Sequence, residues 1–182
     1  MAPWVNVPNL FTLLRLLMAP LVIQAILGGR HVLALALFAA AAFTDYLDGA
    51  TARRFKSTTQ AGAYLDPIAD KCLLSGVFLA LAAARTVPWW LVAVIFGRDL
   101  YILLGAATVM FLTPVRRLPP SVWGKLSTFV QIVTATSWMA RDAFPVQALD
   151  SFALLTVWPC AAFTLWSGLH YTWRGLRMAR AH

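Results

Sequence analysis

Six long apolar runs occupy nearly the whole of this 182-residue chain, at roughly residues 9–29, 32–55, 62–84, 88–112, 121–140 and 151–173. A helix that spans a lipid bilayer needs about 20 mostly apolar residues, and each run has about that length. Hydrophobic residues make up 60% of the chain, whereas a soluble domain has about half. Because backbone hydrogen bonds in lipid must be satisfied inside each helix, we expect an all-α integral membrane protein. Its six transmembrane helices would form one domain over residues 1–182.

Basic residues near the ends of these runs predict the orientation in the membrane. Three of them, Arg30, Arg85 and Arg141, fall on one side. The other side collects Arg53, Arg54, Lys56, Arg116, Arg117, Lys125, Arg174, Arg177 and Arg180. Since an excess of Lys and Arg marks the cytoplasmic side, we expect a multi-pass protein of the cell membrane with both termini in the cytoplasm. The net charge of +8 is also compatible with nucleic-acid binding. A ring of charge at one membrane face favours anionic lipid headgroups as the partner instead.

The acidic residues are concentrated in one stretch of this apolar chain. All seven are aspartates, and four lie in "DYLDGATARRFKSTTQAGAYLDPIAD", residues 45–70. Asp45 and Asp48 are three residues apart, and Asp66 and Asp70 are four apart, so each pair shares a helix face. A short basic loop joins the two predicted helices, which makes them antiparallel neighbours. The four carboxylates would therefore reach a similar depth near the cytoplasmic boundary.

Four neighbouring carboxylates need cations to remain ionised together. A pair of like charges ~4 Å apart repels by about 4 kcal/mol at an effective dielectric constant of 20. Arg53 and Lys71 would offset only part of this repulsion. Ligand sets made of oxygen alone suit Mg²⁺ or Mn²⁺, and a site with two such ions can support phosphoryl transfer. The alternative is a structural cluster paired with arginines, which is less favoured because intramembrane carboxylates are costly and usually functional.

The residues around the aspartates carry a family resemblance. The pattern D-x2-D-G-x2-A-R-x8-G-x3-D-x3-D, from Asp45 to Asp70, resembles the complete signature of the CDP-alcohol phosphotransferase family, also called the CDP-alcohol phosphatidyltransferase family. Members transfer a substituted phosphate from a CDP-linked donor to an alcohol and release CMP. The resemblance implies a membrane enzyme that uses CDP-diacylglycerol and two Mg²⁺ or Mn²⁺ ions, and it implies a homodimer.

The resemblance also implies a role for each matching position. Asp70 would both bind metal and act as the catalytic base that takes the proton of the acceptor hydroxyl, which requires it to lie at the nucleophile. The other implied metal ligands are Asp45, Asp48 and Asp66. The residues implied to contact the donor are Gly49, Arg53, Thr59 and Gly62, although Ser57, Thr58 and Gln60 are equally polar neighbours of Thr59.

Further polar residues lie outside the signature. Asn9, Thr12 and Arg15 recur at intervals of three in "NLFTLLR" and resemble a donor-binding run, the alternative being a helix start with an interfacial arginine. Arg98 lies about ten residues into an apolar run beside Asp99. It would either form a structural pair there or bind an anionic acceptor.

Three more basic residues are candidates for the acceptor site. Arg116 and Arg117 are either ordinary cytoplasmic charges or ligands of the acceptor. Lys125, in the pattern S-x-x-G-K-x-x-T, resembles a family segment and is also assigned to the acceptor.

The choice of acceptor is less constrained. The segments "NVPNLFTLLRLLMAPLV", "LDPIADK" and "PSVWGKLSTFVQ" resemble family members that make phosphatidylglycerophosphate, and also single-domain cardiolipin synthases. We favour glycerol 3-phosphate as acceptor, with phosphatidylglycerol as the alternative. From other classes, a divalent-cation transporter would not need the G-x-x-A-R run. A membrane prenyltransferase would need more helices than 182 residues supply.

Overall fold

The protein is built entirely from helices in the part that the structure describes. The computed structural model describes the backbone of residues 7–55, 60–112 and 121–180 and the side chains of residues 14–44, 70–105, 108 and 121–175. The helices are α1 (Val7–Leu27), α2 (His31–Phe55), α3 (Gln60–Ala83), α4 (Trp89–Leu112), α5 (Val122–Ala143) and α6 (Gln147–Arg180). The prediction of six helices is therefore confirmed.

The helix bounds differ most from the prediction in α6. Its apolar run covers residues 151–173, but the helix continues through a polar and basic segment to Arg180. Hydropathy reports where a segment is apolar and not where its hydrogen-bonded backbone ends. The last turns contain Arg, Leu, Met and Ala, which all favour helix.

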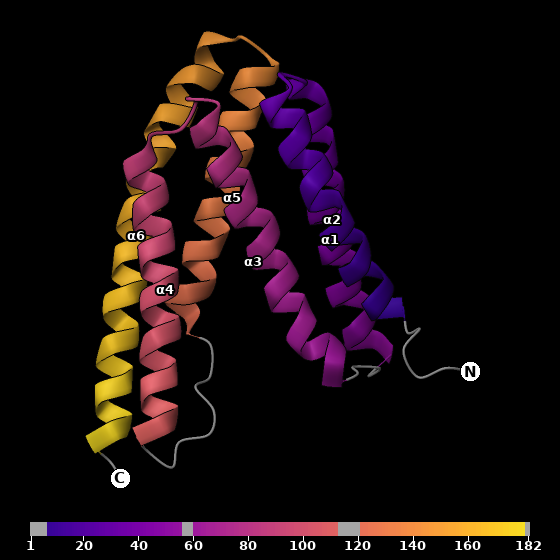
Figure 1. Ribbon diagram of the computed structural model, residues 1–182. Coiled ribbons are helices and arrows are strands. Elements are labelled where there is room, and N and C mark those ends of the chain that lie inside the picture. Colours follow the sequence, from indigo (N-terminus) through magenta and orange to yellow (C-terminus); the bar gives the residue numbers. More distant parts are fainter. Residues whose placement is uncertain (1–6, 56–59, 113–120, 181–182) are drawn as a thin grey trace.

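The helices form two groups that meet at one end of the molecule (Figure 1). In one group α1 packs against both α2 and α3, and in the other α6 packs against α4 and α5. Figure 1 shows the groups close together where α1, α3 and α5 end, and further apart at the opposite end, where α1 begins and α6 ends. The start of α1 and the end of α6 thus lie at the same end of the bundle.

Apolar side chains fill the interior and also cover much of the exterior. Phe78, Leu91 and Met139 are among the largest fully buried ones. Leu155 and Trp158 on α6 point outward and are 67% and 70% exposed. A helix that is apolar on all sides is typical of a core or a lipid environment, and these outward positions have no protein core to face.

A ladder of polar side chains joins α5 to α6 inside the bundle. The Gln131 side-chain amide donates to Thr164 Oγ1 at 3.1 Å, and the hydroxyls of Ser137 and Thr156 lie 3.2 Å apart. All four residues are buried. Hydrogen bonds between small polar residues are a common way to hold helices together in lipid, and here they fix α5 on α6 next to the site described below.

One segment meets the length and composition of a membrane span among the residues described, Gln147–Gly175. Leu14–Leu27 and His31–Thr44 are shorter apolar segments. Charged residues interrupt other helices, as Arg98 and Asp99 do in α4. That all six helices cross a membrane stays a prediction.

Candidate active site

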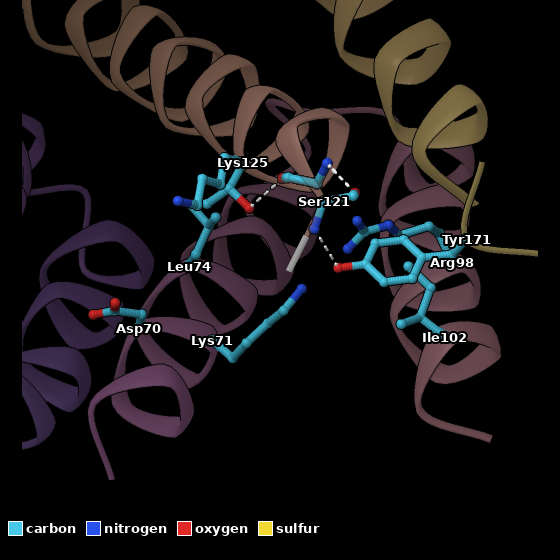
Figure 2. A pocket seen from close by; sticks show the side chains of 10 residues that line it. Asp70, Lys71, Leu74, Arg98, Ile102, Ser121, Lys125 and Tyr171 are labelled. Atoms are coloured by element: carbon cyan, nitrogen blue, oxygen red, sulfur yellow. Dashed lines mark hydrogen bonds between the residues drawn. The ribbon is translucent and has the colours of Figure 1, made fainter. Parts of the chain in front are cut away.

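A cavity of about 390 Å³ lies where α3, α4, α5 and α6 meet. Its charged lining residues are Asp70, Lys71, Arg98 and Lys125. Figure 2 shows Asp70 and Lys125 on one side and Arg98 on the other, with the Lys71 side chain between them. The structure therefore brings the predicted base, Asp70, into one cavity with two of the residues assigned to the acceptor. Among the residues that the structure describes, three cationic side chains and one carboxylate line this cavity.

Asp70 forms an ion pair with a buried arginine of α1. The Nη1 group of Arg15 donates to Asp70 Oδ1 in an ion pair. The side chain of Arg15 is 2% exposed, whereas that of Asp70 is 45% exposed. Close packing of α1 on α3 brings the two together. The donor-binding role assigned to Arg15 stays a prediction, and its contact in the described structure is with Asp70.

Asp99 links the cationic side chains of α3 and α4. Arg98 Nη1 donates to Asp99 Oδ1 at 2.8 Å, and Lys71 Nζ forms an ion pair with Asp99 Oδ2. Arg98 also donates through Nη2 to the Ser167 hydroxyl of α6. The sequence left open whether Arg98 forms a structural pair or faces the site. In the structure it does both, because it pairs with Asp99 and lines the cavity.

The N-terminus of α5 forms another part of the cavity wall. Ser121 is the N-cap, with extended backbone angles (φ −88°, ψ 152°), and its hydroxyl accepts the Gly124 N–H at 3.0 Å. Ser121, Gly124 and Lys125 all line the cavity. A helix N-terminus carries a partial positive charge, which adds to that of Lys125. This wall is therefore suited to an anion.

Most of the site residues predicted from the sequence have no described side chains. Those in helices α1, α2 and α3 are Asn9, Thr12, Asp45, Asp48, Gly49, Arg53, Gly62 and Asp66. Those outside the described residues altogether are Thr59, Arg116 and Arg117. Their assigned roles stay predictions.

The one implied metal ligand with a described side chain fits a divalent ion. Asp70 offers a carboxylate that is nearly half exposed at the cavity, and Mg²⁺ prefers such hard oxygen donors. Among the side chains that the structure describes, no group of three or more His, Cys, Asp or Glu residues could hold a metal. Asp45, Asp48 and Asp66 lie outside that set.

Several residues at the cavity were not assigned to the site from the sequence, Ser121, Ser167 and Tyr171 among them. Ser121 and Tyr171 line the cavity, and Ser167 binds Arg98. A serine after two prolines and before an apolar run is a helix-start signal that would have indicated Ser121 as a cap. No local pattern marks Ser167 or Tyr171, because their place depends on how α6 packs against α4 and α5.

Comparison with known proteins identifies the family of this chain. A family model described as CDP-alcohol phosphatidyltransferase matches residues 5–166. The chain is 36% identical to a probable phosphatidylglycerophosphate synthase of Mycobacterium tuberculosis, over 94% of this chain and 82% of that protein. It is 35% identical to the CDP-diacylglycerol–glycerol-3-phosphate 3-phosphatidyltransferase of Pseudomonas fluorescens, over 97% of this chain and 91% of that protein. It is 33% identical to a CMP-forming cardiolipin synthase of Rattus norvegicus, over 89% of this chain and 58% of that protein. The chain belongs to the CDP-alcohol phosphatidyltransferase family, a family of membrane enzymes that use divalent cations.

Proposed function

We propose that this enzyme transfers the phosphatidyl group of CDP-diacylglycerol to glycerol 3-phosphate and releases CMP. The observation that carries the proposal is the cavity in which Asp70 shares one space with Lys71, Arg98 and Lys125. The names of several relatives support this acceptor. Relatives named for glycerol 3-phosphate or phosphatidylglycerophosphate match over 82–97% of their length. The cardiolipin synthases match over 54–58%.

The charge of the cavity suits the phosphate of glycerol 3-phosphate. A phosphate monoester carries nearly two negative charges and forms its strongest hydrogen bonds with cationic donors. Arg98 and Lys125 approach from different helices, and the N-terminus of α5 adds backbone dipoles of the same sign. Arg116 and Arg117, which precede α5 in the chain, complete the proposed acceptor set.

We assign Asp70 the role of taking the proton in the transfer step, which its position at the cavity supports. The acceptor hydroxyl oxygen would attack the phosphorus that bears diacylglycerol, forming a new P–O bond. The bond between that phosphorus and the bridging oxygen breaks, CMP leaves with the bridging oxygen, and the hydroxyl proton passes to the Asp70 carboxylate. Arg15 holds this carboxylate in one orientation from the protein interior. A base must be fixed at hydrogen-bond distance from the nucleophile, and this ion pair supports that requirement.

The signature aspartates would hold two divalent ions beside the same cavity. We assign Asp45, Asp48, Asp66 and Asp70 as ligands of Mg²⁺ or Mn²⁺. When bound, these ions neutralise charge on the donor pyrophosphate. The proposed donor contacts are Asn9, Thr12, Arg15, Gly49, Arg53, Thr59 and Gly62.

We further propose that the six helices cross the cell membrane with both termini in the cytoplasm. The apolar exterior of α6 and the span Gln147–Gly175 support this, as does the excess of basic residues on one side. Family resemblance supports a homodimer.

An acceptor panel tests the proposal. Purified protein in detergent receives CDP-diacylglycerol, Mg²⁺ and one of glycerol 3-phosphate, phosphatidylglycerol, inositol or serine, and lipid products are identified by mass. We expect glycerol 3-phosphate to be the one acceptor of the four that gives a product, and that product to be phosphatidylglycerophosphate. The variant Asp70→Asn should show no turnover. Cardiolipin as the sole product would assign the enzyme to the alternative acceptor. A product only from inositol or serine would contradict both.

A further inference from the structure

Tyr171 of α6 joins three elements at the wall of the cavity. Its hydroxyl oxygen accepts the backbone N–H of Ser121, the N-cap of α5, at 3.1 Å. Its ring faces the guanidinium of Arg98 on α4, with Cζ 5.9 Å from the ring centroid. Figure 2 shows the Tyr171 hydroxyl turned toward the start of α5, next to Arg98. Tyr171 therefore touches both parts of the wall that we assign to the anionic acceptor.

Tyr171 lies beside Gly124 of α5, which also lines the cavity. A Cβ atom added to Gly124 would lie 3.3 Å from Tyr171 Cε2 and 3.5 Å from Arg98 Nη2. It would also lie 3.3 Å from the Ser121 hydroxyl oxygen. Three side chains thus converge on a residue that has none.

The hydroxyl proton of Tyr171 has no acceptor among the residues that the structure describes. The bond to Ser121 uses an oxygen lone pair, which leaves the O–H group available as a donor. An N–H group that donates to this oxygen polarises the O–H bond and strengthens it as a donor. Arg98, which faces the ring, is a cation and cannot accept this hydrogen bond. A donor in such surroundings is suited to an anionic oxygen.

We propose that Tyr171 is a specificity-determining contact of the acceptor site, whose hydroxyl donates to a phosphate oxygen of the acceptor held by Arg98 and Lys125. This rests on the proposed function for the location of the acceptor. The recognised group is a phosphate, either the monoester of glycerol 3-phosphate or the phosphodiester of phosphatidylglycerol. Tyr171 thereby selects acceptors that carry a phosphate over neutral alcohols.

The test compares Tyr171→Phe with Tyr101→Phe. Tyr171→Phe keeps the ring against Arg98 and removes only the hydroxyl. Tyr101 of α4 is a matched control, because its hydroxyl also bonds to a neighbouring helix, 2.8 Å from Thr172 Oγ1 of α6. Tyr101 is exposed and does not line the cavity. For each protein we would measure the KM of the acceptor, the KM of CDP-diacylglycerol and the inhibition constant of inorganic phosphate. Protection by inorganic phosphate against thermal unfolding gives a readout that needs no turnover.

We expect Tyr171→Phe to raise the acceptor KM and the phosphate inhibition constant roughly tenfold, equal to about 1.4 kcal/mol. Phosphate would protect this variant less, while the donor KM stays within twofold and Tyr101→Phe matches the wild type. Acceptor and phosphate constants within twofold of wild type would overturn the proposal. An equal rise in the acceptor KM and the donor KM would also overturn the proposal, because a general disruption of the site would raise both.

The two proposals fail in different ways. Wild-type product from phosphatidylglycerol alone would overturn glycerol 3-phosphate as the acceptor. The Tyr171 contact would then be judged from the KM of phosphatidylglycerol. If neither acceptor gives a product, the thermal unfolding measurement still tests the Tyr171 contact, because the proposal requires inorganic phosphate to protect Tyr171→Phe less than the wild type.

Discussion

Arg15 and Asp70 form an ion pair between α1 and α3, in which the arginine is buried and the aspartate is nearly half exposed to the cavity. The two residues are 55 positions apart in the chain. The arrangement lets water and substrate reach the carboxylate while its orientation is set from the interior. If Asp70 is the base that we propose, this ion pair gives Arg15 a part in aligning it. The proposed contact of Arg15 with the donor stays a prediction.

Replacing Arg15 tests this alignment. We expect Arg15→Met to lower kcat roughly 10²-fold, since small misplacements of a catalytic group have effects of that size. The acceptor KM should change little, because Arg15 does not line the cavity. Steady-state kinetics with both substrates would measure kcat and the two KM values separately. A variant with wild-type kcat and only a raised donor KM would show that Arg15 binds the donor and does not align Asp70.

The other signature aspartates are predicted to bind the divalent ions. Asp45→Asn, Asp48→Asn and Asp66→Asn each remove one charged ligand with little change in volume. We expect each to abolish CMP release while the thermal unfolding midpoint in detergent without metal stays near that of the wild type. Titration with Mg²⁺ and Mn²⁺ should restore little activity. Wild-type turnover in any of the three would contradict the two-ion site.

Lys125 is predicted to act on the acceptor alone. A hydrogen bond to a charged group contributes about 1.5–3 kcal/mol. Lys125→Ala should therefore raise the KM of glycerol 3-phosphate by roughly tenfold or more, with the donor KM unchanged. Arg116→Ala combined with Arg117→Ala should act in the same direction. Equal changes in both KM values would place these residues outside the acceptor site.

Gly124 is predicted to be required because of what surrounds it. In Gly124→Ala the new methyl group would lie 3.3 Å from Tyr171 Cε2 and from the Ser121 hydroxyl oxygen, which would have to move by a few tenths of an ångström. It would make an ordinary contact with Arg98 Nη2 at 3.5 Å. We expect the acceptor KM to rise several-fold. Gly97→Ala is the control, because a Cβ there meets no atom within 4 Å and alanine favours helix by up to ~1 kcal/mol. If both variants behave alike, the packing around Gly124 has no part in acceptor binding.

The helices were predictable because apolar length alone identifies them. The runs at 32–55 and 88–112 correspond closely to α2 and α4. The end of α6 was not predictable in this way, since its last turns are helical without being apolar. Which helices pack together also could not be read from hydropathy, because nearly every face is apolar.

Part of the site was predictable from local sequence patterns. Asp70 was identified by its spacing from the other aspartates, Arg98 by its charge within an apolar run, and Lys125 by its place in a segment that resembles the family. The partners of these residues come from distant helices: Arg15 reaches Asp70 from α1, and Tyr171 reaches Arg98 from α6. Such contacts depend on helix packing, which the sequence pattern does not encode locally.

The most direct measurement of the central claim follows the oxygen of the acceptor. Glycerol 3-phosphate labelled with ¹⁸O in its primary hydroxyl group would be incubated with the enzyme, CDP-diacylglycerol and Mg²⁺, and both products would be analysed by mass spectrometry. Attack of that hydroxyl on the phosphorus bearing diacylglycerol predicts phosphatidylglycerophosphate that retains the label, with an equal amount of unlabelled CMP. Labelled CMP, or the absence of a phosphatidylglycerophosphate product, would contradict the account.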